Sequence, residues 1–489
     1  MRSGSRQWRL IALCIVVMLA GCASSDGIVR RASPIAPEAV GLEAQTAALS
    51  APAFASDWWT AFNAAELNRL IERALAGNPN LRLAQARVAR AEAIAAQAGA
   101  VAGPQINGAI DATRQRYSAN SVVPAPLGGS TRTVASAQAN ASWELDFFGR
   151  NAASIRAAIG ARHAAQAEAQ AARVALAGSV ARTWLQLSRL LALRELAQRT
   201  LAQREAILDL IRRRVRGGLD TTVELRQGEG ALPEARQRIE EIDEQIALSR
   251  HALAALSGRG PDAADDLAPR LDALVPLALP SRIPVDLIGR RADLTAARWQ
   301  VEAAGSEVDG ARAQFYPNIN LNAFLGLASL GLDRLVEAGS RQWGVGPAVR
   351  LPIFDSGRLR ANLGVKIADL DAAIERYNAK VIDAVHQAAD PLRSLESLEV
   401  QRAEQASAQA AAESAWQLAT QRYKAGLASY LVVLNAETSL LSQRRQAVDL
   451  KARVLDAQVA LIGALGGGFG ADSMPSQEPV SASTSGAIQ

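Results

Sequence analysis

Four short motifs occur twice in this chain, in the same order and about 210 positions apart. A repeat period of this length is typical of a duplicated domain and not of a short solenoid repeat. The matching pairs are residues 105–107 with 318–320, 147–150 with 355–358, 214–219 with 422–427, and 255–258 with 464–467. The sequence therefore predicts two copies of one plan: an alanine-rich helix, two strands, a very long helix, a tip and a returning helix.

Two segments in each copy alternate between apolar and polar residues, as strands with two unlike faces do. The clearest run places Ile319, Leu321 and Leu325 on one face, and Asn320 and Asn322 on the other. The alternating segments cover residues 104–116, 132–148, 317–330 and 341–354. Segments of about 10 residues suit transmembrane β-strands with one lipid face and one wet face. A half-buried soluble sheet has the same alternation and remains an alternative.

These strands cannot close a barrel within one chain, because about eight strands are the minimum. An open strand edge in lipid would leave backbone groups unpaired, which costs several kcal/mol for each group. If the strands lie in the membrane, several chains must therefore share one barrel.

Long helices should connect these strands to the tips. Residues 151–215 contain no proline, which predicts a helix of about 98 Å. Residues 358–424 predict a similar helix, kinked at Pro391. Alternating spacings of three and four residues form coiled-coil seams at Ile367, Leu370, Ile374, Tyr377, Val381, Ala384 and Ala388, and at Ile239, Ile242, Ile246, Ser249, Leu253 and Leu256. Alanines on the other faces would let each helix pack on more than one side, as a cylinder of helices requires.

The N-terminus has the features of a bacterial lipoprotein signal, which is cut before a lipid-bearing cysteine. Three arginines precede a short apolar segment over residues 10–20, and Cys22 follows at once. The segment is too short to span a bilayer as a mature helix. We expect residues 1–21 to be removed and Cys22 to carry a covalent lipid. An ordinary secretory signal with an incidental cysteine is the alternative.

The remaining composition excludes several classes of protein. Cys14 lies in the removed segment, so the mature chain can form neither an internal disulfide nor a cysteine-based metal site. Without the signal arginines, the formal net charge of +5 falls to +2, too small to indicate nucleic acid binding. His163, His251 and His386 lack metal-ligand spacing. Because no nucleophile elbow or phosphate loop is present either, we expect neither an enzyme nor a cofactor.

A group of motifs, each weak alone, covers nearly the whole mature chain. They are Asp57-Trp58-Trp59 with Leu67, Leu70 and Ile71, then Asn78-Pro79-Asn80-Leu81, Phe315-Tyr316-Pro317, residues 351–358 and residues 464–468. Together with the two repeats, these motifs make the chain similar to the TolC-type outer-membrane efflux channels, in their OprM/NodT lipoprotein branch.

The resemblance implies an α+β membrane protein that assembles as a homotrimer in the outer membrane. Three chains of four strands would form one 12-stranded transmembrane β-barrel, continuous with a long periplasmic α-helical coiled-coil barrel. The channel would be passive. An inner-membrane pump, of the RND type or another, would supply the energy, and a periplasmic membrane-fusion adaptor would join the two.

The implied domain boundaries follow the two copies. Residues 22–62 would form the lipid anchor and part of an equatorial belt, to which the linker at residues 259–284 also belongs. The copies would occupy residues 63–258 and 285–466, and residues 467–489 would form a flexible tail.

Two hairpin tips, near residues 214–220 and 422–429, would point into the periplasm. The adaptor-docking residues that the resemblance implies are Arg214, Gly218, Leu219, Arg422, Gly426 and Leu427. The glycines permit the left-handed backbone that a sharp reversal requires. The alternative is that glycine and leucine only close each hairpin, and that the arginines complement helix dipoles.

The resemblance also places a periplasmic gate just past the second tip, where apolar and acidic rings narrow the tunnel. Leu431 matches the apolar ring, with Val432 beside it, and Asn435 stands where the family usually has aspartate. A trimer would then carry three amides instead of three carboxylates, which should weaken cation selectivity. Glu437 is a nearby acid that need not face the lumen. Coiled-coil packing is the alternative role for Leu431.

Glu144, Asp146 and Arg350 fall on the polar face of the strands, the expected barrel lumen, where they would tune permeation. Two other functions stay open: a type I protein-secretion channel of the same fold, and a non-channel coiled-coil lipoprotein that tethers envelope layers. Lipidation and the double tryptophan favour drug efflux, and a tether would not need four strands. The resemblance implies that the pump and the adaptor, more than the duct, select the exported compounds.

Overall fold

The computed structural model describes residues 27–36, 55–120, 122–277 and 291–469, and the chain divides into two compact units. The sheet unit comprises residues 1–34, 87–165 and 296–378, and the helical unit comprises residues 35–86, 166–295 and 379–489. Each unit combines segments from both halves of the sequence, so the repeated motifs do not correspond to separate compact bodies. Cys22, the expected lipidation site, lies outside the described residues.

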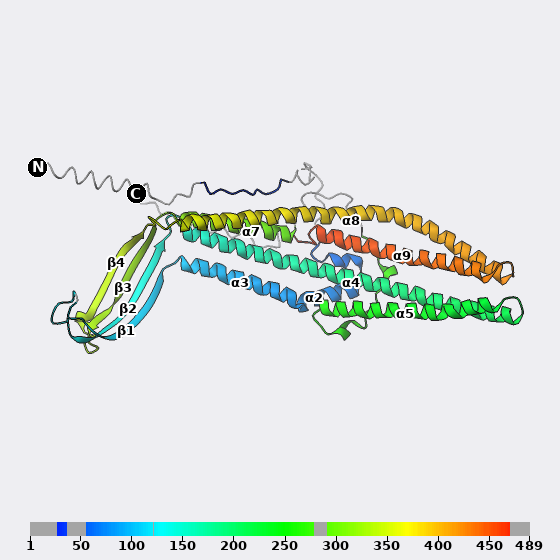
Figure 1. Ribbon diagram of the computed structural model, residues 1–489, viewed down its shortest axis with the longest axis horizontal. Helices are drawn as coiled ribbons and strands as arrows, with labels where there is room; N and C mark the ends of the chain where they lie inside the picture. Colours follow the sequence, from blue (N-terminus) through cyan, green and yellow to red (C-terminus); the bar gives the residue numbers. More distant parts are fainter. Residues whose placement is uncertain (1–26, 37–54, 121, 278–290, 470–489) are drawn as a thin grey trace. The chain divides into compact units, whose positions relative to one another are not determined.

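The order helix, two strands, long helix and shorter helix occurs twice along the chain (Figure 1). The 3-10 helix η2 (Trp58–Phe62) and helix α2 (Ala65–Gly77) come first. The first series is α3 (Pro79–Val101), β1 (Gln105–Arg116), β2 (Thr131–Leu145), α4 (Arg150–Arg216) and α5 (Thr222–Leu256), followed by η3 (Pro261–Ala264) and η4 (Leu271–Ala273). The second is α7 (Ala292–Ala313), β3 (Asn318–Leu330), η5 (Ala338–Ser340), β4 (Arg341–Arg350), α8 (Arg358–Lys424) and α9 (Tyr430–Ala464). Helices α4 and α8 each contain 67 residues, and α5 and α9 each contain 35.

The strands form one antiparallel sheet in the order β1-β2-β3-β4. Its register brings the alternating apolar residues onto one face, where Trp143 pairs with Leu321, and Leu325 with Trp343. This face is not covered by the rest of the chain: the exposed fraction is 68% for Leu325 and 74% for Trp343. The sheet therefore presents a broad apolar surface that a second molecule or a lipid phase must cover.

Two strands end earlier than the alternation predicts. Strand β4 ends at Arg350 and not at residue 354, because Pro352 has no amide hydrogen to donate to a neighbouring strand. Strand β2 ends at Leu145 and not at residue 148. There the carboxylate of Asp146 accepts hydrogen bonds of 3.0 and 2.7 Å from the first amides of α4, so the chain turns into the helix.

A small apolar core in the sheet unit holds α7 against α8. Ile28 and Ala32 from the N-terminal segment pack against this core. The carboxylate of Asp371 in α8 accepts hydrogen bonds from the backbone amides of Arg31 and Ala32, at 3.1 and 3.0 Å. The segment that shortly follows the expected lipidation site is thus fixed to the unit that carries the sheet.

The core of the helical unit is larger and contains the N-terminal tryptophan motif. Trp58, Trp59 and Phe62 are buried with apolar side chains of α2, α4, α5 and α9. The Asn78 side chain accepts a hydrogen bond of 2.8 Å from the Asn80 amide and donates one of 2.9 Å to a carbonyl at the end of α5. The motifs at residues 57–59 and 78–81 therefore serve the packing of this unit.

The expected seam of α8 is confirmed, because Ile374, Ala384 and Ala388 are fully buried. The helix continues through Pro391, whose missing amide hydrogen costs one backbone bond without ending the helix. Across the described part of the chain, no helix is both long and apolar enough to cross a membrane.

Candidate functional site

The two hairpin tips of the helical unit have the same backbone geometry. Gly218 and Gly426 have φ angles of +74° and +77°, which confirms the left-handed turn that the sequence predicts. The next residue, Leu219 or Leu427, donates its amide to the carbonyl five positions earlier, at 2.8 Å in both tips. This bonding pattern is the Schellman motif, which satisfies carbonyls at a helix end. Both leucines are exposed, at 68% and 71%.

Arg214 does not extend into solvent but connects the two tips. Its guanidinium donates hydrogen bonds of 2.9 and 3.2 Å to the two carboxylate oxygens of Asp220. It also lies 4.6 Å from the ring centre of Tyr423 in α8, whose hydroxyl donates to the same carboxylate. The side chains of Arg214 and Asp220 are only 12% and 8% exposed. One carboxylate thus accepts hydrogen bonds from both hairpins.

Asp220 with its two donors, Arg214 and Tyr423, forms the link between the tips. The pKa values of these groups favour this link at neutral pH. Burial and the Asp220 carboxylate raise the pKa of the Tyr423 hydroxyl, which therefore stays a donor. Burial alone would raise the pKa of Asp220, but the hydrogen bonds from Arg214 and Tyr423 outweigh it and hold the pKa below its usual value. The stabilisation from an acid with a depressed pKa is lost only as the pH falls through that value. The link should therefore weaken only below the ordinary range of aspartate.

The helices that return from the tips begin differently. Thr221 and Glu224 form a capping box at the start of α5: the Thr221 hydroxyl accepts the Val223 amide, and the Glu224 carboxylate accepts the Thr221 amide. Helix α9 begins after Ser429, whose side chain makes no capping hydrogen bond. The first tip therefore has a side-chain cap that the second tip lacks.

The candidate gate residues Leu431, Val432 and Asn435 lie together on one face near the start of α9. Leu431 is 53% exposed, Val432 is 48% exposed, and Asn435 is exposed as well. The tip packing uses their neighbours Tyr430 and Val433, which are buried in one apolar cluster. The three residues are thus available to line a passage or to contact another chain.

Glu437 faces the interior of the helical unit. Its side chain is 3% exposed and lies 3.4 Å from the Arg204 guanidinium. Burial raises the pKa of Glu437, and the charge of Arg204 offsets this only in part. Because the Glu437 carboxylate is buried beside Arg204, it cannot supply the negative charge that an aspartate at position 435 would bring to the gate.

The residues expected on the lumen face have different surroundings. Glu144 forms an ion pair of 3.1 Å with Arg150. Arg350 is the last residue of β4, and the register places it on the same polar face as Glu144. Asp146 departs from the prediction because it lies beyond β2 and caps α4.

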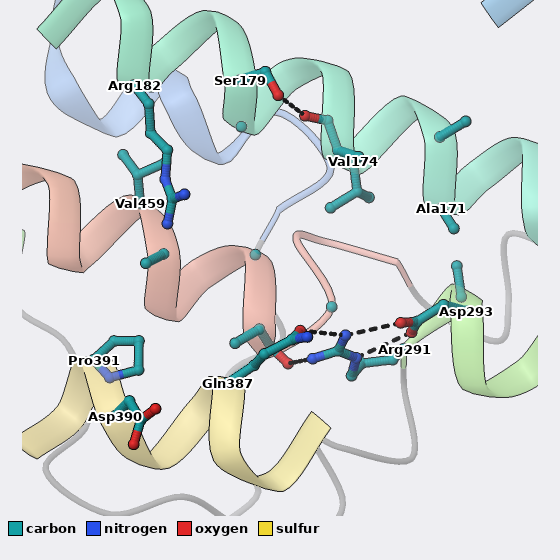
Figure 2. A pocket seen from close by; sticks show the side chains of 18 residues that line it. Ala171, Val174, Ser179, Arg182, Arg291, Asp293, Gln387, Asp390, Pro391 and Val459 are labelled. Carbon is teal, nitrogen blue, oxygen red and sulfur yellow. Dashed lines mark hydrogen bonds and ion pairs between the residues drawn. The ribbon is translucent and has the colours of Figure 1, made fainter. Parts of the chain in front are cut away.

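A buried arginine that the sequence does not mark ties three helices together in the helical unit (Figure 2). Arg291 donates to the Asp293 carboxylate at 3.0 and 2.8 Å, to Gln387 at 2.9 Å, and to the carbonyl of Ala464 at 3.1 Å. Burial alone would raise the pKa of Asp293, but the hydrogen bonds from Arg291 lower it below its usual value. Figure 2 shows these groups along a cavity of about 720 Å³, with α4 on its other side. Acceptors from the protein already surround the Arg291 guanidinium. The role of this arginine is therefore to hold the three helices together and not to bind a ligand.

We predict that Arg291→Met lowers the free energy of unfolding by about 2–3 kcal/mol, since the buried acceptors lose their donor. Guanidinium denaturation followed by circular dichroism would measure the change. Arg298→Met is the control, because Arg298 is 71% exposed and pairs only at the surface with Glu302. Its expected effect is within about 0.5 kcal/mol. Equal losses in both variants would contradict the role of Arg291.

Sequence reasoning missed Asp220 and Tyr423, although one signal for Tyr423 was available. The tip motifs align Tyr423 with Val215 of the first copy, so a hydroxyl appears where the other copy is apolar. No comparable signal marks Asp220. Among the described residues, no group of three or more histidine, cysteine or acidic side chains could hold a metal ion.

Comparison with known proteins gives a consistent result. The sequence profile of the family described as outer membrane efflux protein matches residues 70–259 and 283–467. The fusaric acid resistance protein FusA of Burkholderia cepacia is 37% identical over 361 residues, which cover 73% of this chain and 68% of FusA. The multidrug resistance outer membrane protein MdtQ of Escherichia coli O157:H7 is 33% identical over 463 residues, 93% of this chain and 97% of MdtQ.

Solved structures of similar proteins have the same fold. The outer membrane protein VceC of Vibrio cholerae has a TM-score of 0.81 at 36% identity, and the match covers 85% of this chain and 100% of VceC. The open state of the MtrE outer membrane channel of Neisseria gonorrhoeae has a TM-score of 0.76 at 26% identity, over 90% and 98% of the two chains.

Proposed function

This chain belongs to the outer membrane efflux protein family, and from that premise we propose that it is the passive exit duct of a tripartite efflux pump. It would conduct drugs or other small toxic compounds from the periplasm to the exterior. The observation that carries this proposal is the sheet with one exposed apolar face and one polar face. Such a sheet suits a wall between lipid and water. The names of FusA and MdtQ favour efflux of small compounds over protein secretion, and a simple tether would need no such sheet.

The proposed assembly is a homotrimer. The sheet is an open meander in which β1 and β4 are edge strands, and β4 of one chain could pair with β1 of the next. Three chains would then close a 12-stranded barrel without open edges, continued by a coiled-coil barrel of the long helices. The matching lengths of α4 with α8 and of α5 with α9 support an origin by internal duplication.

We further propose that Cys22 carries a covalent lipid that anchors the protein in the outer membrane. The attachment of residues 27–36 to the sheet unit supports this, since a lipid on Cys22 would start from the unit that carries the sheet. The proposed equatorial belt comprises residues 22–62 and 259–284, and residues 467–489 form the proposed tail.

Leu219, Arg422 and Leu427 are the proposed contacts for a periplasmic adaptor. All three are exposed on the tips, and Gly218 and Gly426 set their geometry. Arg214 contributes through its link between the tips, since its guanidinium is already bonded. The proposed pump partner is an inner-membrane transporter of the RND type or another type.

The proposed gate consists of Leu431, Val432 and Asn435 from each chain. Its test is single-channel conductance of the purified, lipidated protein in a planar bilayer, beside the Asn435→Asp variant. We expect a trimeric pore, and we expect Asn435→Asp to raise the potassium-to-chloride permeability ratio about threefold or more, because three carboxylates would attract cations at the constriction.

Each outcome of this experiment has a separate meaning. If a trimeric pore forms but Asn435→Asp does not change its selectivity, the proposed channel function stands. The proposed position of the gate is then wrong. Thr438→Asp is the control, because Thr438 is exposed one turn further along α9 and should have a smaller effect. The absence of a pore both in the wild type and in a variant with the gate leucine removed, Leu431→Gly, would overturn the proposed function.

A further inference from the structure

A second cavity, of about 730 Å³, lies in the sheet unit where the strands give way to helices. Its strand residues Glu144, Asn318 and Arg350 belong to the polar face of the sheet. The first residues of α4 and α8 complete its wall. A volume of this size is within the range of small-molecule sites.

The charges around this cavity leave one arginine uncompensated. Glu144 is paired with Arg150. Asp146 accepts two amides at the start of α4, and Asp355 accepts the Leu359 amide at 2.9 Å at the start of α8. Within the described residues, Arg350 has neither an ion pair nor a side-chain hydrogen bond. The lining acids thus face either a cation or a helix start, since Asp355 also lies 4.0 Å from Arg358. Of the three arginines that line the cavity, Arg350 is the one without an acidic partner among the described residues.

The same cavity carries a large amount of aromatic and apolar surface. The rings of Phe148 and Tyr316 stack with centroids 4.9 Å apart and planes 10° apart. They remain 43% and 55% exposed, so ring surface is available for further contact. Ile353 and Phe354 add exposed apolar groups on the connection from β4 to α8. A cation beside open aromatic surface is suited to a ligand that combines a flat apolar part with one negative charge.

We propose that this cavity binds amphipathic aromatic anions, such as aromatic monocarboxylates, with Arg350 as the partner of the carboxylate and the Phe148–Tyr316 pair as the contact for the ring. The proposal rests on the proposed function, because the polar face of the sheet would then border the conducting path. The cavity would be a binding site that such compounds occupy along the export pathway.

The test uses 2-naphthoate and its neutral analogue 2-naphthylmethanol with the full-length, lipidated protein in detergent. Naphthalene fluorescence would report binding without requiring a pore. We expect Arg350→Gln to weaken 2-naphthoate binding about tenfold or more, and Arg350→Lys to recover part of the loss. Arg341→Gln is the matched control, since Arg341 is an exposed arginine at the opposite end of the same strand. It should bind as the wild type does.

The outcomes separate this inference from the proposed function. Equal 2-naphthoate binding in the wild type and Arg350→Gln would overturn the inference even when the protein forms pores. Equal affinity for the neutral analogue would also overturn it, because the ligand charge would then be irrelevant. Binding that depends on Arg350 in a protein without pore activity would support the site and reject the channel.

Discussion

Replacing Leu325 with arginine is expected to abolish assembly of the proposed trimer in the outer membrane. Leu325 lies near the middle of β3 on the exposed apolar face, where it pairs with Trp343. A charged side chain on the lipid face costs about 2–4 kcal/mol at the bilayer midplane. Three copies would cost about 6–12 kcal/mol, which exceeds a factor of ten thousand in the assembly equilibrium. The measurement is the amount of heat-modifiable trimer in outer-membrane fractions.

Asn322→Arg is the matched control for this prediction. Asn322 lies on the same strand, three residues away, and its side chain belongs to the polar face. An arginine there would project toward water, so trimer yield should stay close to that of the wild type. Equal yields for Leu325→Arg and Asn322→Arg would show that the apolar face does not contact lipid. Equal losses would show that the sheet tolerates no bulk on either side.

Tyr423→Phe is expected to raise the open probability of the channel at least tenfold. The substitution removes the hydroxyl that donates to Asp220 and leaves the ring near Arg214. A hydrogen bond to a charged group contributes about 1.5–3 kcal/mol, and each 1.4 kcal/mol corresponds to a factor of ten. If the link holds the tips in their closed arrangement, its loss in three chains shifts the equilibrium toward the open state. Single-channel recordings would measure the change.

The neighbouring Tyr430 provides the control. Its ring centre lies 5.9 Å from that of Tyr423 in the same apolar cluster, and it takes no part in the hydrogen bonds of Asp220. Tyr430→Phe should therefore leave the open probability near that of the wild type. If the open probability rises in both variants, the cause is a general loosening of the tips. If it rises in neither variant, the contact between Tyr423 and Asp220 has no part in gating.

The features that the sequence predicted depend on local geometry. The strand faces follow from a period of two, and Gly218 and Gly426 follow from the need for a positive φ. The predicted strand ends were less accurate. Apolar residues continue at alternate positions beyond the observed ends, with Phe147 after Leu145 and with Leu351 and Ile353 after Arg350, although Asp146 and Pro352 end the pairing. Periodicity reports which side a residue faces and carries no information on where backbone hydrogen bonds stop.

The candidate site was only partly predictable because its key contacts join distant parts of the chain. Tyr423 and Asp220 are 203 positions apart, and Arg291 is 173 positions from Ala464. Such pairs depend on how helices that are far apart in the sequence come together, which no local pattern encodes. The same limit applies to Arg214, since its charge and tip position indicated docking, whereas its neighbours make it an internal link.

The unequal starts of α5 and α9 have a consequence for the evolution of the tips. The capping box at Thr221 fixes the start of α5 by hydrogen bonds within the first tip itself, so a substitution at Thr221 or Glu224 would remove a cap. The start of α9 has no such cap, so the residue at position 429 is not held by a capping role. If the chain arose by the proposed internal duplication, one copy can preserve the scaffold while the other adapts. Changes of partner or cargo should therefore accumulate around Ser429 and Asn435 before they reach Thr221.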